Sequence, residues 1–228
     1  MEMKKDRNKT LNEKAYHNIK QMIFNKNLGP GQKLVYKDLC QTLNMSPTPI
    51  IHSLCRLEQE GFLSSEPFRG FYIKPLDPQE AWDLYGVREA LETYAIEQAI
   101  QQMDEKSMGI LSKIAQKHEQ YMPDYYDKKK IALDAEFHIQ MAEISRNQAL
   151  VKLLRRNLEH VYIRYRLQNT HPSRMIPAAE EHHKLLQRIK KKDIIGSIEI
   201  IRIHIRKARD TAIAELSKEH ESINFGLL

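Results

Sequence analysis

The residues from Leu28 to Ile73 read LGPGQKLVYKDLCQTLNMSPTPIIHSLCRLEQEGFLSSEPFRGFYI. They begin with a Gly-Pro-Gly turn, continue with two helical patterns separated by a tight turn, and reach a glycine that stops the second pattern. Two short apolar runs at 62–65 and 70–73 then enclose four turn residues and predict a small hairpin. This order of elements is the layout of a winged helix-turn-helix, and it indicates DNA as a partner.

Apolar periodicity predicts a core-packing helix at 11–27, a second helix at 36–43 and a third at 48–60. Ser46 is expected to cap the third helix, whose first turn tolerates the prolines found there. The third helix is therefore the predicted recognition helix, and the hairpin is the predicted wing. Arg69 at the wing tip is placed to enter a minor groove or to meet a phosphate, although a solvated turn residue is an equal alternative.

The positive charge of the chain is concentrated on the same segment. The 228 residues carry a formal net charge of +6. Residues 1–75 hold 12 Lys and Arg against 7 Asp and Glu, an excess of +5, whereas residues 76–228 hold 24 against 23, an excess of +1. A basic surface is often only a solvated face, but its coincidence with the helix-turn-helix favours contact with phosphates.

Composition narrows the class of protein further. An apolar content of 41% over 228 residues is enough for two compact cores without disulfides. Cys40 and Cys55 lie in helical patterns at no metal or redox spacing, so we interpret them as reduced core residues. The N-terminal residues have charge but no apolar run, and about 18 consecutive apolar residues occur nowhere, which predicts a cytoplasmic protein without a membrane span.

A linker follows the basic segment. Residues 74–78 read KPLDP, which breaks both strand and helix, and the remaining pattern is almost wholly helical. The predicted helices are 78–101, 104–121, 127–145, 149–167, 177–191 and 193–219. The predicted fold class is therefore mainly α, with a winged helix-turn-helix in residues 1–75 and an all-helical antiparallel bundle in residues 76–228.

Three motifs carry a resemblance to a known family. PGQKL at 30–34, DLCQTLNMSPTPI at 38–50 and LCRLEQEGFLSSEPFRGFYI at 54–73 resemble the DNA-binding domain of the GntR family of bacterial transcriptional regulators. The resemblance covers essentially all of residues 11–75. It implies a homodimer that binds a two-fold related double-stranded DNA operator, with recognition helices in adjacent major grooves.

The chain departs from the family pattern at the start of the recognition helix. The family usually has Ser-Arg-Thr-Pro, an apolar residue and then Arg-Glu, whereas this chain has Pro47 and Ile51 at the arginine positions. Lys37 stands where the second helix usually offers an arginine, and it keeps the charge without the bidentate fork that suits guanine. We therefore expect weaker or unusual sequence readout, with DNA contacts from Lys37, Ser46, Thr48, His52 and Arg69.

Four residues of the helical segment form a candidate metal site. Asp134 and His138 are spaced i, i+4, which places them on one face of a helix about 6 Å apart along its axis. His182 and His204 lie among alanine, leucine and isoleucine residues and are expected to face inward. Three histidines and a carboxylate that converge suit a divalent ion such as zinc or nickel, with coordination positions left open. Taken singly, each histidine is more simply a core residue, and spacing within one helix does not bring three helices together.

A second family resemblance implies that these three helices do meet at one site. LYGVREALETYAIEQAI at 84–100, DAEFHIQMAEISRNQAL at 134–150 and EEHHKLLQRIKKKDIIGSIEIIRIHIRKA at 180–208 resemble the FCD domain, the helical effector domain of the FadR branch of the GntR family. The metal ligands of that family fall here on Asp134, His138, His182 and His204. The resemblance also implies dimerisation and a small carboxylate effector held on the metal, with Arg88, Arg164 and Arg166 as candidate lining residues. A salt bridge to Glu89 or Glu92, or a dimer contact, remains open for Arg88, and a solvated face for the other two.

These observations lead to one hypothesis and two alternatives. The hypothesis is a transcriptional repressor, not an enzyme, that senses a small organic acid at a metal-containing site and binds an operator as a homodimer. The first alternative is a degenerate regulator that binds DNA mainly through phosphates. The second is a metal-dependent hydrolase, since three histidines and an aspartate with open positions can activate water, although the sequence places no obvious general base.

Overall fold

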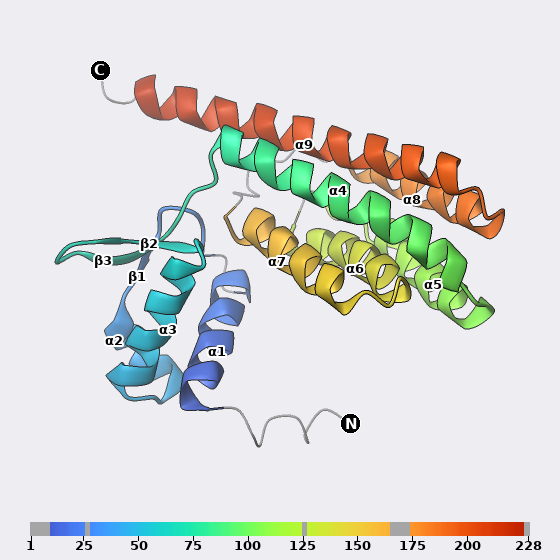
Figure 1. The fold of residues 1–228 in the computed structure, drawn as a ribbon. Helices are drawn as coiled ribbons and strands as arrows, with labels where there is room; N and C mark the ends of the chain where they lie inside the picture. Colours follow the sequence, from blue (N-terminus) through green and yellow to red (C-terminus); the bar gives the residue numbers. More distant parts are fainter. Residues whose placement is uncertain (1–9, 26–27, 125–126, 165–173, 226–228) are drawn as a thin grey trace. The chain divides into compact units, whose positions relative to one another are not determined.

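The structure is a computed structural model, and it describes residues 10–25, 28–124, 127–164 and 174–225, with side chains up to residue 218. The described chain divides into two compact units (Figure 1). The first runs to Pro75 and includes Ile163 and Arg164, and the second holds the other described residues from Leu76 onward.

In the described part of the first unit there are three helices and a three-stranded sheet: α1 (Leu11–Asn25), β1 (Lys33–Leu34), α2 (Tyr36–Leu43), α3 (Pro47–Gln59), β2 (Leu63–Glu66) and β3 (Gly70–Ile73). The sheet has the order β1-β3-β2, and both strand pairs are antiparallel. Glu66 pairs with Gly70 at the closed end of the β2–β3 hairpin. This hairpin extends away from the three helices as a wing (Figure 1).

Two residues in the left-handed backbone conformation end the helices of the helix-turn-helix. Asn44, with φ 49°, follows α2, and Gly61, with φ 84°, follows α3. At each position two backbone amides donate back into the preceding helix, at 2.8–3.3 Å. Asparagine and glycine adopt this conformation more readily than other residues, so both helix ends are set by local residues. The predicted turn and the predicted glycine stop are confirmed.

One apolar core holds the first unit together. Its buried members up to residue 73 are Ala15, Tyr16, Ile19, Ile23, Leu34, Leu39, Ile50, Leu54, Leu57, Phe62, Leu63 and Ile73. Cys40 and Cys55 carry free thiols and are only half-buried. Cys40 packs against the core, whereas Cys55 lines a surface pocket, so the interpretation of both as core residues is correct for Cys40 alone.

The described residues of the second unit form six helices: α4 (Pro78–Gln102), α5 (Glu105–Gln120), α6 (Lys128–Ile144), α7 (Gln148–Arg164), α8 (Met175–Lys190) and α9 (Ile194–Phe225). An aspartate carboxylate caps the start of α4, α5 and α6, accepting a hydrogen bond from the amide three residues later at 2.7–2.8 Å. Helix α4 packs against α6 and α9, α5 against α6 and α8, and α8 against α9. Figure 1 shows α4 and α9 running side by side.

The mainly helical fold with a small sheet in the winged unit is confirmed, and the differences are local. The strand β1 was not predicted because two residues are too short for an alternating pattern. Helix α8 begins two residues before Pro177 because proline is tolerated in a first turn, where its missing amide has no partner to lose. Residues 74–77 lie outside helix and strand, as the linker pattern predicted.

Candidate metal centre and DNA-binding surface

Four buried side chains from three helices meet inside the second unit. Asp134 and His138 lie on α6, His182 on α8 and His204 on α9. One ligand atom from each lies within 4.8 Å of the others. Two donors that share one ion at about 2.1 Å are at most about 4.2 Å apart, so a small contraction brings all four into coordinating range.

Asp134 is the common neighbour of the three imidazoles. Its Oδ2 lies 3.5 Å from His138 Nε2, one turn along the same helix. Its Oδ1 lies 3.5 Å from His182 Nε2 and 3.9 Å from His204 Nε2. The His138 and His204 Nε2 atoms are themselves 3.2 Å apart. All three histidines therefore bring the same ring nitrogen to one carboxylate.

Two further carboxylates orient these rings, a role that the sequence interpretation gave to neither, since it named Glu92 only as a possible partner of Arg88. His138 Nδ1 lies 2.5 Å from Glu92 Oε2, and His204 Nδ1 lies 2.8 Å from Glu181 Oε2. A carboxylate accepts hydrogen bonds, so each Nδ1 donates and each Nε2 lone pair is left for the cluster. Histidine ligands of metals are commonly held in this way by an outer carboxylate, which fixes the ring and raises its basicity.

The donor set fits a divalent metal ion. Both ring nitrogens of His182 are buried and have no hydrogen-bond partner among the described residues, and such unpaired groups cost about 1–3 kcal/mol each. Burial lowers the pKa of His182 well below its usual value, which keeps the ring neutral, the form that binds metal. Burial raises the pKa of Asp134, but the neighbouring His138 outweighs it, so the pKa lies well below its usual value and the carboxylate is charged.

A fourth histidine, which was not predicted, lies beside the cluster. His118 on α5 is fully buried, and its Nε2 is 3.9 Å from Asp134 Oδ1. Its ring centroid is 5.0 Å from that of His182. Neither ring nitrogen has a hydrogen-bond partner among the described residues, and burial lowers its pKa to about 4. The sequence did carry a signal, because the buried face of α5 is Leu111, Ile114, Ala115 and His118, at the spacing i, i+3, i+4, i+7.

Two buried or nearly buried arginines stand next to the centre. Arg88 on α4 donates from Nε to Glu92 at 2.6 Å, the ion pair left open by the sequence, and its Nη2 lies 3.9 Å from Asp134. Arg174, just before α8, donates to Glu181 at 2.5 Å and to the His204 carbonyl at 3.2 Å. The Nη2 of Arg88 and the Nε and Nη1 of Arg174 are buried and have no hydrogen-bond partner among the described residues.

The other two predicted effector residues are placed differently. Arg164 groups with the first unit, where its Nε donates to the Lys74 carbonyl at 3.1 Å and its Nη2 to the Pro75 carbonyl at 2.9 Å. It is 1% exposed, so the alternative of a solvated face is wrong for this residue. Arg166 lies outside the described residues.

The predicted DNA-contacting side chains on the helices are all exposed. Lys37 lies on α2, and Thr48 and His52 lie on the outer side of α3. Ser46 precedes α3 in the extended conformation of a cap residue, but its side chain makes no capping hydrogen bond, so that part of the prediction is wrong. Ile51 is 42% exposed on the same helix, so an apolar side chain is present on the outer surface of α3.

The wing ends in a turn that carries both a charge and an aromatic ring. Arg69 is exposed, and its Nη1 donates to Glu66 at 3.2 Å across the turn. Phe68 is fully exposed and has φ 63°, a conformation that is unfavourable for an aromatic residue. The tip therefore presents an unpacked ring next to the predicted groove-contacting arginine.

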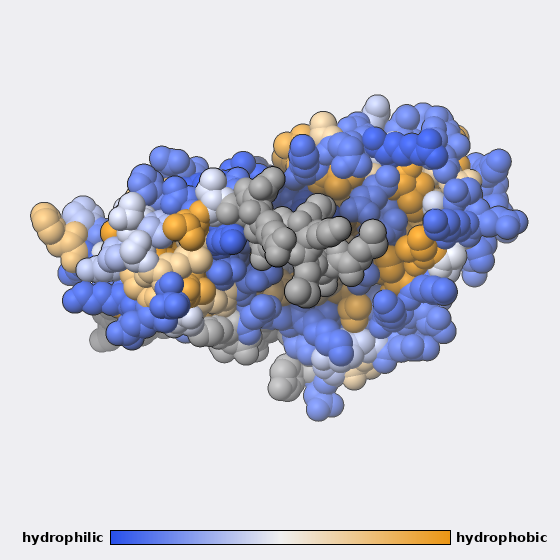
Figure 2. Space-filling view, turned by 90° about the horizontal axis from the view of Figure 1, so that it is seen from below, coloured by the Kyte–Doolittle hydropathy of each residue, from blue (hydrophilic) through white to orange (hydrophobic). Residues whose placement is uncertain are grey.

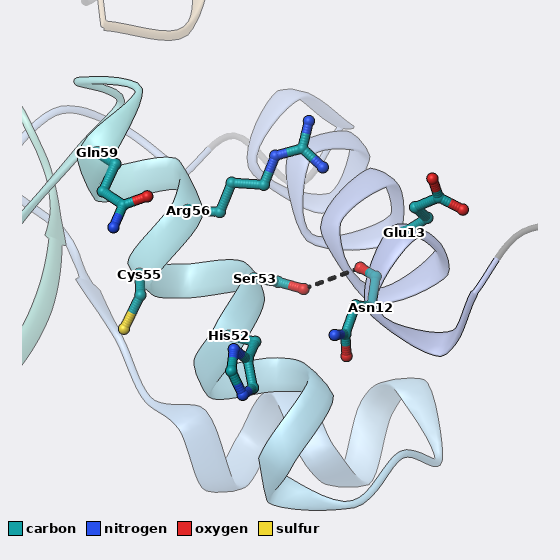
Figure 3. Close-up of a pocket in the computed structure, with 7 residues that line it drawn as sticks. All are labelled: Asn12, Glu13, His52, Ser53, Cys55, Arg56 and Gln59. Atoms are coloured by element: carbon teal, nitrogen blue, oxygen red, sulfur yellow. Dashed lines mark hydrogen bonds between the residues drawn. The ribbon is translucent and has the colours of Figure 1, made fainter.

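A surface pocket of about 340 Å³ lies on the recognition helix. Its walls come from α1 and α3, with the lining residues Asn12, Glu13, His52, Ser53, Cys55, Arg56 and Gln59 (Figure 3). The Ser53 hydroxyl donates to the Asn12 carbonyl at 3.1 Å and so joins the two helices at the base of this surface. His52 therefore lines this pocket and is also exposed on the outer side of α3.

Comparison with models of known protein families shows which family this chain belongs to. A family model described as the FCD domain matches residues 83–207, which is more than half of the chain. A second model, described as bacterial regulatory proteins of the gntR family, matches residues 11–73. The chain belongs to the GntR family of transcriptional regulators. This GntR regulator carries its FCD domain on the helical unit that holds the Asp134 cluster.

Relatives of this GntR regulator extend over most of its length. It is 28% identical over 179 residues to the uncharacterized HTH-type transcriptional regulator YdhC of Bacillus subtilis, covering 78% of this chain and 80% of the relative. It is 29% identical over 132 residues to the Nta operon transcriptional regulator of Aminobacter aminovorans, covering 58% and 62%. Both relatives are regulators of transcription by name, which agrees with a non-enzymatic role.

Solved structures show the same fold. The Escherichia coli protein McbR/YncC matches with a TM-score of 0.78 at 21% identity, over 93% of this chain and 99% of that one. A putative GntR transcriptional regulator from Rhodococcus sp. RHA1 matches with a TM-score of 0.74 at 14% identity, over 89% and 97%. Within the described part of the chain, no helix combines the length and the apolar character needed to span a membrane.

Proposed function

We propose that this GntR regulator is a metal-containing repressor that binds a two-fold related operator and responds to a small organic acid. The observation that carries the proposal is the buried Asp134–His138–His182–His204 cluster within the FCD domain of a chain that also has a winged helix-turn-helix. A divalent ion there, zinc or nickel, supplies open positions for a carboxylate. A coupling free energy of about 1–3 kcal/mol between effector and operator is enough to switch occupancy.

The arginines beside the cluster support a carboxylate as the effector. Arg88 and Arg174 both have buried N–H groups without a hydrogen-bond partner among the described residues, next to the proposed metal ligands. An arginine pairs with a carboxylate through short charge-assisted hydrogen bonds. A bound acid would satisfy these N–H groups and add negative charge beside two cations. Arg174 thereby joins Arg88 as an effector-binding candidate, whereas the Arg164 side chain donates hydrogen bonds to the Lys74 and Pro75 carbonyls.

The direct test is DNA binding by the full chain. Selection from a random duplex library is expected to return a two-fold related sequence, and fluorescence anisotropy at low salt is expected to show preference for it over scrambled duplex. Metal-loaded protein is expected to release this operator when the matching carboxylic acid is added. Absence of sequence-dependent binding in every metal state would overturn the proposal.

Lys37→Ala tests whether the helix-turn-helix contacts phosphates. We expect affinity to fall by a similar factor for operator and scrambled duplex, and the slope of log K against log salt to fall by about 1, because one phosphate contact is lost. Lys113→Ala is the matched control, since Lys113 is an exposed lysine on α5 in the FCD domain. A His52→Ala variant that weakens only operator binding would separate base readout from the alternative of mainly non-specific binding. Equal salt slopes for Lys37→Ala and wild type would remove Lys37 from the interface.

Arg174→Met tests the effector site. Titration calorimetry with acetate and citrate on metal-loaded protein is expected to show binding that weakens about 10–100-fold in the variant, which corresponds to the loss of a hydrogen bond to a charged group. Metal content is expected to stay unchanged, because Glu181 keeps its contacts with His204 and Lys207. Arg188→Met is the control, since Arg188 lies on α8 but pairs with Asp193 at the surface. Equal affinity of Arg174→Met and wild type for both acids would exclude this arginine.

Dimerisation has a candidate surface on the helical unit. Large apolar side chains remain exposed on α4 and α9, namely Trp82, Val87, Tyr94, Ile195 and Ile203. Figure 2 looks at the molecule from below, away from α9, and shows that apolar areas also lie between hydrophilic ones on that face. Exposed apolar surface of this kind commonly marks protein interfaces. Light scattering coupled to size-exclusion chromatography is expected to give twice the chain mass, and a monomeric mass at all concentrations would contradict the homodimer.

A further inference from the structure

The buried imidazole of His118 has no role in the four-residue cluster, yet it is built into the same place. Its helix α5 packs against α6 and α8, the two helices that supply Asp134 and His182. The end of α5 is fixed by the buried Lys130, whose Nζ donates to the His118 and Tyr121 carbonyls. The Lys130 hydrogen bonds therefore fix the last turn of α5, and they hold the His118 side chain in its buried position.

His118 shares two distances with His204, a member of the proposed cluster, although His118 is not one of the four residues whose ligand atoms all lie within 4.8 Å of one another. His204 Nε2 lies 3.9 Å from Asp134 Oδ1, and its ring centroid lies 4.8 Å from that of His182. His118 Nε2 lies 3.9 Å from the same oxygen, and its centroid lies 5.0 Å from that of His182. The 3.9 Å separation is within the limit of about 4.2 Å for two donors of one ion. Both nitrogens of His118 also lack a partner among the described residues, unlike those of His204.

We propose that His118 is a fifth protein donor to the metal, so that this FCD domain holds a centre of one aspartate and four histidines. The proposal rests on the metal site proposed above and adds α5 to it. Five protein donors favour a five- or six-coordinate ion over the four-coordinate geometry typical of structural zinc. They also leave room for one oxygen of an effector carboxylate in a six-coordinate ion, so that the second oxygen is free for an arginine.

The test counts imidazoles on the metal. X-ray absorption on the full chain loaded with nickel is expected to give four coordinated imidazoles in wild type and three in His118→Phe, where an apolar ring of similar size fills the same space. Competition with a chelator is expected to show about 10–100-fold weaker nickel binding in the variant. His183→Phe is the matched control, because His183 is the half-exposed neighbour of His182 and pairs with Glu119 at 2.9 Å. It is expected to keep four imidazoles and wild-type affinity.

A second variant separates a lost ligand from a disturbed fold. In His118→Ala, free imidazole added to the solution can enter the vacated space, and it is expected to restore the fourth imidazole and the absorption spectrum of the cobalt-loaded protein. Three imidazoles in wild type, unchanged in His118→Phe, would overturn the role of His118 while leaving the four-residue site intact. No metal binding by wild type would instead overturn the metal site itself.

Discussion

Replacing His182 with alanine is expected to reduce metal content from about one ion per chain to near zero and to make thermal stability independent of metal. His182 is one of three imidazoles that bring Nε2 to Asp134, and its nitrogens have no other partner among the described residues. A metal present at about 100 times its Kd stabilises the folded state by about 2.7 kcal/mol. For a unit of about 150 residues this corresponds to roughly 5–10 °C in Tm.

The measurement compares Tm with and without a chelator, alongside elemental analysis of the purified chain. Wild type is expected to lose its metal-dependent increment when the chelator is added, whereas His182→Ala is expected to show the same Tm with and without chelator, because it holds no metal to remove. His183→Ala controls for a change at the adjacent position, and it is expected to keep the metal and the chelator effect. A His182→Ala protein with one ion per chain and a chelator-sensitive Tm would exclude His182 as a ligand.

Local rules in the sequence predicted most of the fold. Apolar periodicity located the helices, while proline, glycine and asparagine marked their ends, because these signals act within a few residues of the chain. The i, i+4 pair of Asp134 and His138 was likewise predicted from helix geometry alone. The meeting of α6, α8 and α9 was not, since it depends on the packing of the whole bundle, and only the family resemblance pointed to it.

Glu92 and His118, whose places beside the cluster were not predicted, are both polar residues on an otherwise apolar helix face. Glu92 lies on the same buried face of α4 as Ala95, Ile96 and Ala99, and His118 continues the buried face of α5. A polar residue at such a position interrupts the periodicity and is read as surface. Buried charges persist only when they are paired or bind an ion, so an ionisable residue in register with an apolar stripe predicts a partner on another helix. The identity of that partner requires the tertiary structure.

Glu92→Gln is expected to have the largest effect on stability. Glu92 is 3% exposed and joins two groups, accepting from Arg88 Nε at 2.6 Å and from His138 Nδ1 at 2.5 Å. Burial raises the pKa of Glu92, but His138 and Arg88 together lower it to about 2, so the wild-type carboxylate is charged. Removing its charge leaves the buried Arg88 guanidinium without its close counter-ion, a change that costs about 3–5 kcal/mol. The expected fall in Tm is on the order of 10 °C for a unit of this size.

Glu89→Gln is the matched control for that substitution. Glu89 lies three residues before Glu92 on α4 but is half-buried, and it pairs with Arg202 and Arg206, whose exposed side chains let water screen the interaction. Little change is expected in its Tm, as measured by calorimetry, or in its metal affinity. If Glu92→Gln behaved like Glu89→Gln in both measurements, the buried carboxylate would have neither of the roles assigned to it.

The double variant Arg88→Met, Glu92→Leu separates the two roles of Glu92. Replacing both buried charges with apolar side chains removes the unpaired cation, so most of the stability lost in Glu92→Gln is expected to return. Metal affinity is expected to stay about 10–100-fold below wild type, because His138 Nδ1 still lacks the carboxylate that orients its ring. Recovery of stability together with wild-type metal affinity would show that Glu92 only balances Arg88. Recovery of stability alone assigns to Glu92 the positioning of His138 at the metal.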